Sequence, residues 1–526
     1  MLSELIYGVR LLGVGLVLAR EGALAAIDAG ALPPVARIGL RCARLIERRG
    51  AGADRGSGRV AAGLTRLGPS WVKLGQFMAT RPDVVGVRIA RELETLQDRM
   101  APFPQAQAEA IIAQSFGRPF EQIFADFSGP VGAASIAQVH KARPVGLPNG
   151  DLVAVKVLRP GVRARFQRDL GAMRYAARAV ERLVPSTRRL RPLEVVETLA
   201  RSVTIEMDLR LEAAALSELA ENTKGDPDFR VPRVEWSLTE RDVMTSEWID
   251  GVKLTDLGAV AAAGHDRVAL ARAIIQSFLR HALRDGFFHA DMHPGNLFVD
   301  GDGRLVAVDF GIMGRLGFKE RRFLAEILYG FISRDYMRVA EVHFEAGYVP
   351  AEHSVADFAQ ALRAIGEPIH NRRADEISMA RVLTLLFEVT ALFAMKTRTE
   401  LVMLQKTMVV VEGVGRTLDP HLDMWSTADP VVREWITRNL GPVGRLEEAG
   451  RGLAGLAARV AALPETLGRA ERVLDRLEEA ATTGFALDAD TTDRIGRAEA
   501  RRARWSALAL WLIVILLAGW MMFGSR

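Results

Sequence analysis

The sequence predicts an α+β protein in which a small mixed lobe of strands and helices precedes a larger, helical lobe. Strand-like segments are concentrated between residues 131 and 251. From Asp266 onward the pattern is helical, apart from one hairpin at residues 297–308. A charge-free apolar stretch at 505–523 predicts a C-terminal transmembrane helix.

The composition is that of a globular chain rather than a disordered one. The 526 residues are 49% hydrophobic and 25% charged, with a net charge of +5. The single cysteine, Cys42, excludes an intrachain disulfide and a cysteine metal cluster, which fits a reducing compartment. No zinc-finger or aromatic-basic signature accompanies the basic excess, so nucleic acid is not an expected partner.

Six segments are expected along the chain. They are an N-terminal helical segment at 1–60, a helical extension at 61–125, the small lobe at 126–255, the helical lobe at 256–430, a helical connector at 431–504 and the membrane helix at 505–523. Within the first segment, residues 11–19 are apolar but too short to span a bilayer. This stretch is equally compatible with a helix that lies on a membrane and with a helix that packs in the core. No signal peptide is indicated.

The small lobe is expected to combine a cationic strand residue with an acidic helix. Residues 131–141 resemble two strands around a tight turn of small residues, and a following strand contains Lys156. Further along, Glu206, Asp208 and Glu212 offer three carboxylates. Asp208 and Glu212 are four residues apart, so on a helix they would share a face. Lys156 is a candidate partner for that face, although an acidic helix face is more often simply solvated.

The most informative pattern lies in the helical lobe, where Asp291 is followed by Asn296 and Asp309. An aspartate can act as a base or orient an attacking hydroxyl, and amide and carboxylate oxygens suit Mg²⁺ that bridges nucleotide phosphates. The hairpin at 297–308 would return Asp309 to the same edge as Asn296. The alternative is a chance scatter of Asp and Asn around a hairpin. The turn at 300–303 resembles a calcium loop but lacks the later carboxylate ligands.

The apolar stretch at 505–523 has the flanks of a membrane helix. At about 1.5 Å per residue its length matches a bilayer core of roughly 30 Å. Trp505 and Trp520 lie near its ends, as interfacial aromatic residues do. By the positive-inside bias the rest of the chain is expected on the cytoplasmic side, because arginines precede the stretch: Arg494, Arg497, Arg501, Arg502 and Arg504. A buried globular helix is the alternative.

A set of motifs resembles one family. The motifs are WVKLGQ at 71–76, RPD at 81–83, LQD at 96–98, AASIAQVH at 133–140, EMD at 206–208, QKTMVVVEGVGR at 405–416 and LDMW at 422–425. Together they resemble the UbiB family, the atypical kinases of ubiquinone biosynthesis that are also called the ADCK group in animals, and its bacterial members in particular. The resemblance covers about residues 64–425, and it implies an atypical protein-kinase-like fold.

The resemblance implies ATP and Mg²⁺ as cofactors and gives roles to the residues that hold them. An alanine-rich loop would bind the nucleotide in place of a glycine-rich loop: Ala133, Ala134, Ser135, Ile136 and Ala137. Lys156 and Glu212 would form the ion pair of the small lobe. Asp291, Lys156 and Asn296 would be catalytic, and Asn296 and Asp309 would bind the metal.

The resemblance also implies an occluded cleft. Lys73 and Gln76 would reach into the position where a protein kinase admits its peptide, and Glu206 and Asp208 would help to hold this extension. One departure is Gly132, which stands where the family usually has alanine or a similar small residue. Because glycine loosens the backbone, it bears on nucleotide choice.

The expected function is therefore a membrane-anchored atypical kinase or ATPase that supports ubiquinone biosynthesis. The expected location is the bacterial inner membrane, with a single C-terminal span and a cytoplasmic kinase-like domain. Expected partners are membrane lipid, polyprenyl quinone precursors and other ubiquinone-biosynthesis enzymes. Two alternatives are a nucleotide-sensing scaffold without turnover and a small-molecule or lipid kinase. No flavin fingerprint or oxygen-activating metal cluster supports a ring hydroxylase.

Overall fold

The computed structural model describes residues 2–23, 58–79, 101–146, 151–183, 191–369 and 399–441. Shorter described stretches lie at 46, 85–93, 96, 100, 188, 385, 388–390 and 392–395. The chain divides into two compact units, Met1–Thr437 and Arg438–Arg526. The elements that position the candidate site belong to the first unit. Most of the expected connector at 431–504 lies outside the described residues. The expected membrane helix at 505–523 lies outside them entirely.

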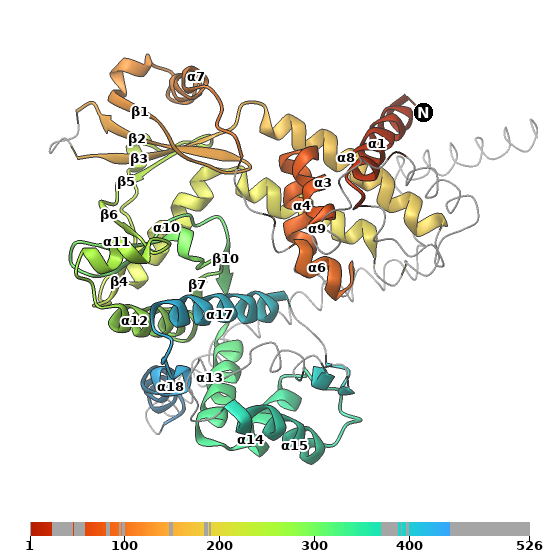
Figure 1. The fold of residues 1–526 in the computed structure, drawn as a ribbon, viewed down its shortest axis with the longest axis vertical. Coiled ribbons are helices and arrows are strands. Elements are labelled where there is room, and N and C mark those ends of the chain that lie inside the picture. Colours follow the sequence, from red (N-terminus) through yellow and green to blue (C-terminus); the bar gives the residue numbers. More distant parts are fainter. Residues whose placement is uncertain are drawn as a thin grey trace, which may run out of the picture. The chain divides into compact units, whose positions relative to one another are not determined.

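The small lobe is built on an antiparallel sheet in the order β1-β2-β3-β5 (Figure 1). Its strands are β1 Phe124–Ala133, β2 Ala137–Pro144, β3 Val153–Leu158 and β5 Val243–Glu247. Along β3 every second side chain is buried on one face, namely Val153, Val155 and Val157, and these pack in a cluster with α7 (Gln105–Phe116). Because neighbouring strand residues point to opposite faces, Lys156 is directed to the other face.

A helical subdomain packs on the same lobe. It contains α1 Leu2–Arg20, α3 Arg59–Leu67, α4 Pro69–Ala79, α6 Val87–Leu93, α8 Val162–Leu183, α9 Pro192–Glu206 and α10 Leu209–Asn222. One apolar cluster runs from α1 through α3, α4, α6, α8 and α9 to the end of the β1–β2 turn. The extension therefore shares its core with the alanine-rich loop, since Ile136 is buried in this cluster together with Trp71, Leu93 and Leu96.

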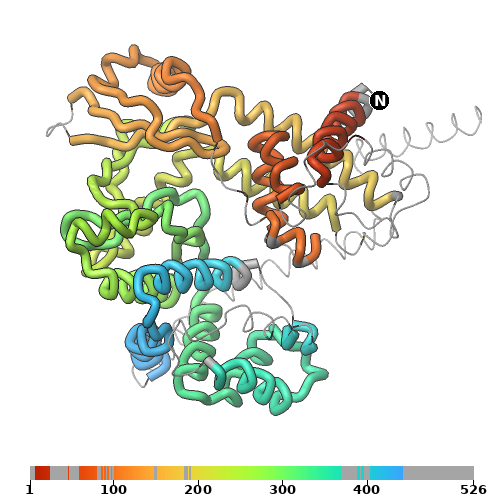
Figure 2. The backbone as a smooth tube through the Cα atoms, in the orientation of Figure 1, coloured from red at the N-terminus to blue at the C-terminus, as the bar shows by residue number. Residues whose placement is uncertain are grey.

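The helical lobe contains further helices and two small sheets. The α-helices are α11 Leu257–Ala262, α12 Arg267–Arg280, α13 Phe318–Ser333, α14 Tyr336–Glu345, α15 Val355–Gly366, α17 Thr399–Leu418 and α18 Met424–Leu440. The strands are β4 Phe229–Arg230, β6 Gly251–Lys253, β7 Phe287–His289, β8 Leu297–Asp300, β9 Leu305–Ala307 and β10 Met313–Arg315, in the sheets β4-β9-β8-β6 and β10-β7. In Figure 2, α17 returns along α12, far from it in sequence.

Short 3₁₀ and π turns complete the elements. They are η3 Phe120–Gln122, η5 Trp236–Leu238, η7 Pro294–Asn296 and η8 Glu367–Ile369, with a π turn, η6, at His281–Asp285. Acidic side chains start several α-helices by accepting hydrogen bonds from first-turn N–H groups, as Asp266 does for α12 and Asp335 for α14.

The predicted hairpin is confirmed. β8 and β9 pair antiparallel with Leu297 opposite Ala307, and the turn is closed by the Asp300 carboxylate, which accepts hydrogen bonds from the N–H groups of Asp302 and Arg304. The prediction of helix everywhere else after Asp266 was wrong. β7 pairs with β10 through Met313 opposite His289, in a ribbon too short to show a periodic pattern.

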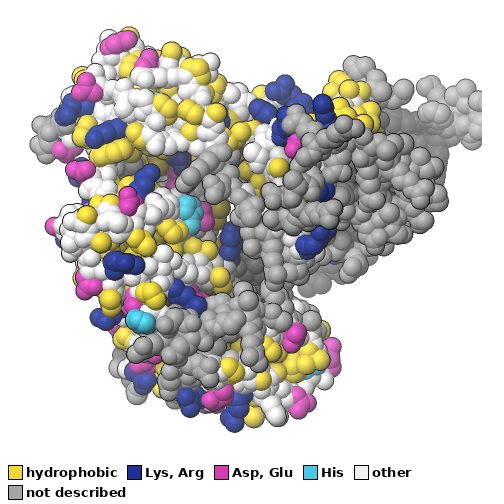
Figure 3. Space-filling model, viewed as in Figure 1, with side chains coloured by type: hydrophobic (Ala, Val, Ile, Leu, Met, Phe, Trp, Pro, Cys, Tyr) yellow, Lys and Arg dark blue, Asp and Glu magenta, His cyan; other side chains and the backbone are white. Residues whose placement is uncertain are grey.

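The first helix packs against the core on one side only. α1 contacts α8 and α3, and Val14 and Ala19 are buried. Its other face exposes apolar side chains at helical spacing: Ile6, Val9, Leu12 and Leu16, at 57%, 64%, 74% and 50% exposure. Figure 3 shows hydrophobic side chains at the surface over α1. No helix among the described residues combines the length and apolar character needed to cross a bilayer.

Candidate active site

Lys156 on β3 is the centre of the site. Its Nζ lies 2.6 Å from Glu212 Oε1 and 2.9 Å from Asp309 Oδ1. Glu212 comes from α10, and its carboxylate also accepts a hydrogen bond from the Phe310 N–H at 3.2 Å. One ammonium thus joins a strand of the small lobe, a helix and the Asp-Phe-Gly segment.

Burial and charge oppose each other at this cluster. Burial disfavours a charged Lys156, but the carboxylates of Asp309 and Glu212 outweigh it and raise the pKa of the ammonium above its usual range. The charge of Lys156 lowers the pKa of Asp309, and Lys73 contributes in the same direction. Burial raises the pKa of Glu212, against the attraction of Lys156. Lys156 is therefore held protonated, as a partner for phosphate must be.

Asp309 follows the hairpin and occupies an uncommon backbone conformation. Its φ is 68°, in the left-handed region that non-glycine residues seldom adopt, at a cost on the order of 1 kcal/mol. Its side chain is 45% exposed, whereas that of Glu212 is 5% exposed. The carboxylate of Asp309 is accordingly open to a ligand, and that of Glu212 is committed to the protein.

The loop between β7 and β8 carries the other expected residues. Asn296 is buried, and its Nδ2 donates to the Asp291 carbonyl oxygen at 3.2 Å, which holds the loop closed. The Asp291 N–H donates to His289 Nδ1 at 3.0 Å, and burial lowers the pKa of His289, so the ring is neutral. The Asp291 side chain is 38% exposed. The Val308 N–H donates to the Asn296 carbonyl, so the hairpin brings Asn296 beside Asp309.

These residues fit a magnesium ion. Mg²⁺ in nucleotide sites is held by one or two protein oxygens together with phosphate oxygens and water. The exposed carboxylate of Asp309 and the Asn296 amide supply oxygens of this kind from adjacent positions of one hairpin. Among the described residues no group of three or more His, Cys, Asp or Glu is placed to hold a metal ion.

The alanine-rich loop links β1 to β2. The Ala134 N–H donates to the Ala137 carbonyl at 2.8 Å, and Ser135 and Ile136 are buried while Ala133 and Ala134 are partly exposed. The loop leads into the start of β2, whose Val139 pairs with Lys156 on β3. The register of the sheet therefore places the loop near the lysine.

The extension reaches the site through Lys73 on α4. Lys73 Nζ lies 2.7 Å from Glu206 Oε2, and both side chains are largely buried. Its charge is close enough to lower the pKa of Asp309. Gln76 behaves differently: its Nε2 donates to the Leu96 carbonyl at 3.5 Å, a contact within the extension.

The three carboxylates belong to two helices, and only Asp208 and Glu212 lie at the same helix start. α9 ends at Glu206, and Asp208 is the N-cap of α10, where its carboxylate accepts from the Arg210 N–H. Asp208 pairs with Arg210 at 2.8 Å and with Arg241 at 3.9 Å rather than with a lysine of the extension. The chain breaks the helix here because an N-cap aspartate stabilises a new helix start. Glu206 and Glu212 consequently serve different lysines.

Sequence reasoning missed residues that support the loop. His289, two residues before Asp291, was given no role of its own. Thr407 on α17 donates from Oγ1 to the Ala290 carbonyl at 2.9 Å and is fully buried. Thr407 lies in the motif at 405–416, which the resemblance had marked without a role.

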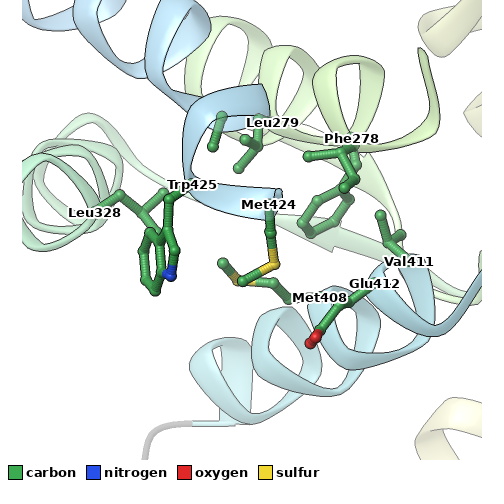
Figure 4. Close-up of a pocket in the computed structure, with 10 residues that line it drawn as sticks. Phe278, Leu279, Leu328, Met408, Val411, Glu412, Met424 and Trp425 are labelled. Carbon is green, nitrogen blue, oxygen red and sulfur yellow. The ribbon is translucent and has the colours of Figure 1, made fainter. Parts of the chain in front are cut away.

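A small cavity lies away from this cluster. A cavity of about 10 Å³ is enclosed by α12, α13, α17 and α18 (Figure 4). Figure 4 shows Phe278, Met408, Met424 and Trp425 around it, with the Glu412 carboxylate at one side. Glu412 is paired with Arg416 at 2.9 Å. This volume accommodates about one water molecule, so the cavity is a packing defect rather than a ligand site.

The strand lysine, its helix carboxylate and the series of Asp291, Asn296 and Asp309 around one hairpin define the class: a kinase-like fold. The ABC1 atypical kinase-like domain matches residues 95–343, and the UbiB helical domain matches residues 362–423. A probable protein kinase UbiB of Marinobacter nauticus is 42% identical over 394 residues, covering 74% of this chain and 72% of the relative. One of Vibrio cholerae is 41% identical over 396 residues, with coverage of 74% and 72%. The chain belongs to the UbiB family of atypical kinase-like proteins.

A solved structure was also found to be similar. Rv3197 of Mycobacterium tuberculosis, determined in complex with erythromycin, aligns over 76% of this chain and 97% of its own with a TM-score of 0.48 and 21% identity.

Proposed function

We propose that this chain is a membrane-attached atypical kinase or ATPase that binds Mg-ATP and supports ubiquinone biosynthesis by acting on, or giving access to, membrane lipid intermediates. The observation that carries the proposal is Lys156 Nζ held between Glu212 and Asp309. A protonated lysine beside an open carboxylate is suited to bind phosphate and a divalent cation together.

Each residue has a chemical task in this proposal. Lys156 neutralises phosphate charge, and Glu212 keeps the ammonium oriented. Asn296 and Asp309 hold Mg²⁺, which when bound neutralises charge on the transferred phosphoryl group. Asp291 accepts the proton of the attacking hydroxyl or water, and its half-exposed side chain supports that task.

The acceptor is proposed to be water or a small lipid rather than a protein side chain. The ion pair between Lys73 and Glu206 fixes the extension beside the catalytic cluster, where it would compete with a bound peptide. Phosphate release should therefore exceed phosphoryl transfer to added proteins. Robust transfer to proteins, absent with Asp291→Asn, would contradict this assignment. Nucleotide binding without any turnover would instead favour the nucleotide-sensing scaffold.

The proposed membrane attachment is supported by two features. The apolar stretch at 505–523 follows a run of arginines in the sequence. The outer face of α1 exposes an apolar row that a bilayer surface would cover. Such attachment suits polyprenyl quinone precursors, whose tails stay in the bilayer, and it would bring the site close to other ubiquinone-biosynthesis enzymes.

Nucleotide binding is tested by thermal unfolding of the purified chain with and without Mg-ATP. A ligand that binds only the folded state raises the melting temperature. Wild-type protein should show this rise, and Lys156→Met and Asp309→Asn should each remove it. As a control, Arg143→Ala, an exposed substitution on β2, should keep the rise. An unchanged rise in both site variants would falsify the proposed site.

A further inference from the structure

Arg159 holds the alanine-rich loop from outside the site. It follows β3, three residues after Lys156. Its side-chain Nε donates to the Ala134 carbonyl at 2.9 Å, and its backbone N–H donates to the Ile136 carbonyl at 2.8 Å. One residue thus fixes the directions of two carbonyls in a loop of five residues.

The fixed carbonyls determine where the loop N–H groups point. In a planar trans peptide the carbonyl and the following N–H point in opposite directions. Because the Ala134 carbonyl is turned toward Arg159, the Ser135 N–H is turned away from it. The Ile136 carbonyl orients the Ala137 N–H in the same way. Backbone N–H groups aligned in this manner are the donors with which short loops bind phosphate.

The guanidinium is itself held in a rigid frame. It lies over the Phe103 ring, 5.7 Å from the centroid. The Phe103 backbone is clasped by the Gln138 side chain, which accepts from its N–H at 2.9 Å and donates to its carbonyl at 3.2 Å. Gln138 is fully buried and directly follows the loop on β2. The contacts that hold the Arg159 guanidinium therefore run from the loop through Gln138 and Phe103 back to the loop.

A second connection ties the loop to the same segment. The Met100 N–H donates to the Ala133 carbonyl at 3.2 Å, three residues before Phe103. The first half of the loop is therefore held by residues 100–103 and by Arg159 together. The small side chains leave it without much packing of their own, since Ala133 and Ala134 are partly exposed. Hydrogen bonds to the carbonyls are what define its shape.

We propose that Arg159 is a positioning residue that sets the alanine-rich loop in the shape that binds the phosphates of nucleoside diphosphates and triphosphates. This inference rests on the proposed nucleotide site. In this inference Arg159 acts through the loop, whereas Lys156 would contact phosphate directly. The property that matters is the direction of the hydrogen bond rather than the positive charge, because the planar guanidinium donates from Nε in a fixed direction and a lysine ammonium does not.

The test measures affinities of the full-length chain for Mg-ADP, Mg-ATP and adenosine by titration calorimetry. Arg159→Ala should weaken Mg-ADP and Mg-ATP by about tenfold or more and leave adenosine within about threefold, because only phosphates meet the loop N–H groups. Arg159→Lys keeps the positive charge and should lose affinity to a similar degree. Arg143→Ala removes an exposed arginine from β2 and should change none of the three affinities.

The outcomes distinguish this inference from the proposed function. If wild-type protein binds neither Mg-ADP nor Mg-ATP, the nucleotide site itself fails. If it binds both and Arg159→Ala keeps the wild-type ratio of Mg-ADP to adenosine affinity, the positioning role is overturned. An equal loss for all three ligands would indicate a merely structural residue and would also overturn it. Wild-type affinity in Arg159→Lys would show that charge alone acts.

Discussion

At the scale of single residues, the site depends on one buried cation that two carboxylates share. A buried ion pair stabilises a protein only when its partners are well placed, because both charges lose their hydration. Lys156 satisfies this condition, since its side chain is 12% exposed and lies within 3 Å of both partners. Glu212 has the further task of accepting from the Phe310 N–H, so it also orients the segment that begins at Asp309.

Glu212→Gln should abolish most nucleotide-stimulated activity and destabilise the fold by on the order of 3 kcal/mol, because it leaves a buried ammonium with one charged partner fewer. The matched control is Glu218→Gln on the same helix, where the pair with Arg315 is exposed. That change should cost less than about 1 kcal/mol. Urea unfolding and Mg-ATP turnover of both variants provide the measurement, and equal effects would contradict the assignment.

At the scale of elements, the turn into β7 determines where the loop that carries Asp291 and Asn296 begins. The π turn at residues 281–285 ends at Gly286, whose φ is +66°. A Cβ at Gly286 would lie 2.5 Å from the Leu316 carbonyl oxygen. Both the conformation and the space therefore require glycine at this position.

Gly286→Ala should destabilise the protein by about 2 kcal/mol or more and lower activity, because β7 and the loop after it must shift. Gly264→Ala is the matched control. Gly264 also has a positive φ, +78°, but nothing lies within 4 Å of the position that a Cβ would occupy there. The Gly264→Ala variant should lose stability only through backbone strain, on the order of 1 kcal/mol. Thermal and urea unfolding would compare the two, and a larger loss for Gly264→Ala would contradict the argument.

The exposed row on α1 leads to a prediction about membranes. In a chain that lacks residues 505–526, Leu12→Glu should reduce binding to anionic liposomes by about tenfold or more, since a charge would enter the apolar face. Met337→Glu, at a 46% exposed methionine on α14, is the control and should leave binding unchanged. Liposome co-sedimentation measures both variants. Equal binding by the truncated parent and by Leu12→Glu would remove α1 from the membrane contact.

At the scale of the whole molecule, burial keeps several histidines neutral and makes the fold sensitive to acid. Burial lowers the pKa values of four histidines: His140, His281, His289 and His343. A histidine whose pKa is lowered in the fold binds its proton more readily in the unfolded chain, where its pKa is 6.5. The contribution of such a group to the free energy of unfolding is fully present above the pKa of the unfolded chain. It is lost as the pH falls below that pKa.

His343 isolates this effect, because it lies outside the cluster around Lys156 and its Nδ1 donates to the Val339 carbonyl at 2.7 Å. Between about pH 7.5 and about pH 5.5 the wild type should lose stability, and His343→Gln should reduce the loss by up to about 1.4 kcal/mol per pH unit. His421→Gln, at an exposed position, should leave the dependence unchanged. Urea unfolding across this range is the measurement, and identical slopes for wild type and His343→Gln would contradict it.

The sequence alone determined the family, and it singled out Lys156, Glu212 and Asp309, which the structure brings together. Lys156 and the hairpin before Asp309 could be predicted because strand alternation and turn residues are local signals. The pairing of β7 with β10, the separate partners of Asp208 and Glu212, and the contacts of Thr407 and Arg159 were decided by the tertiary structure. Each depends on contacts between residues far apart in sequence or on competition between partners, and neither leaves a periodic pattern in the chain.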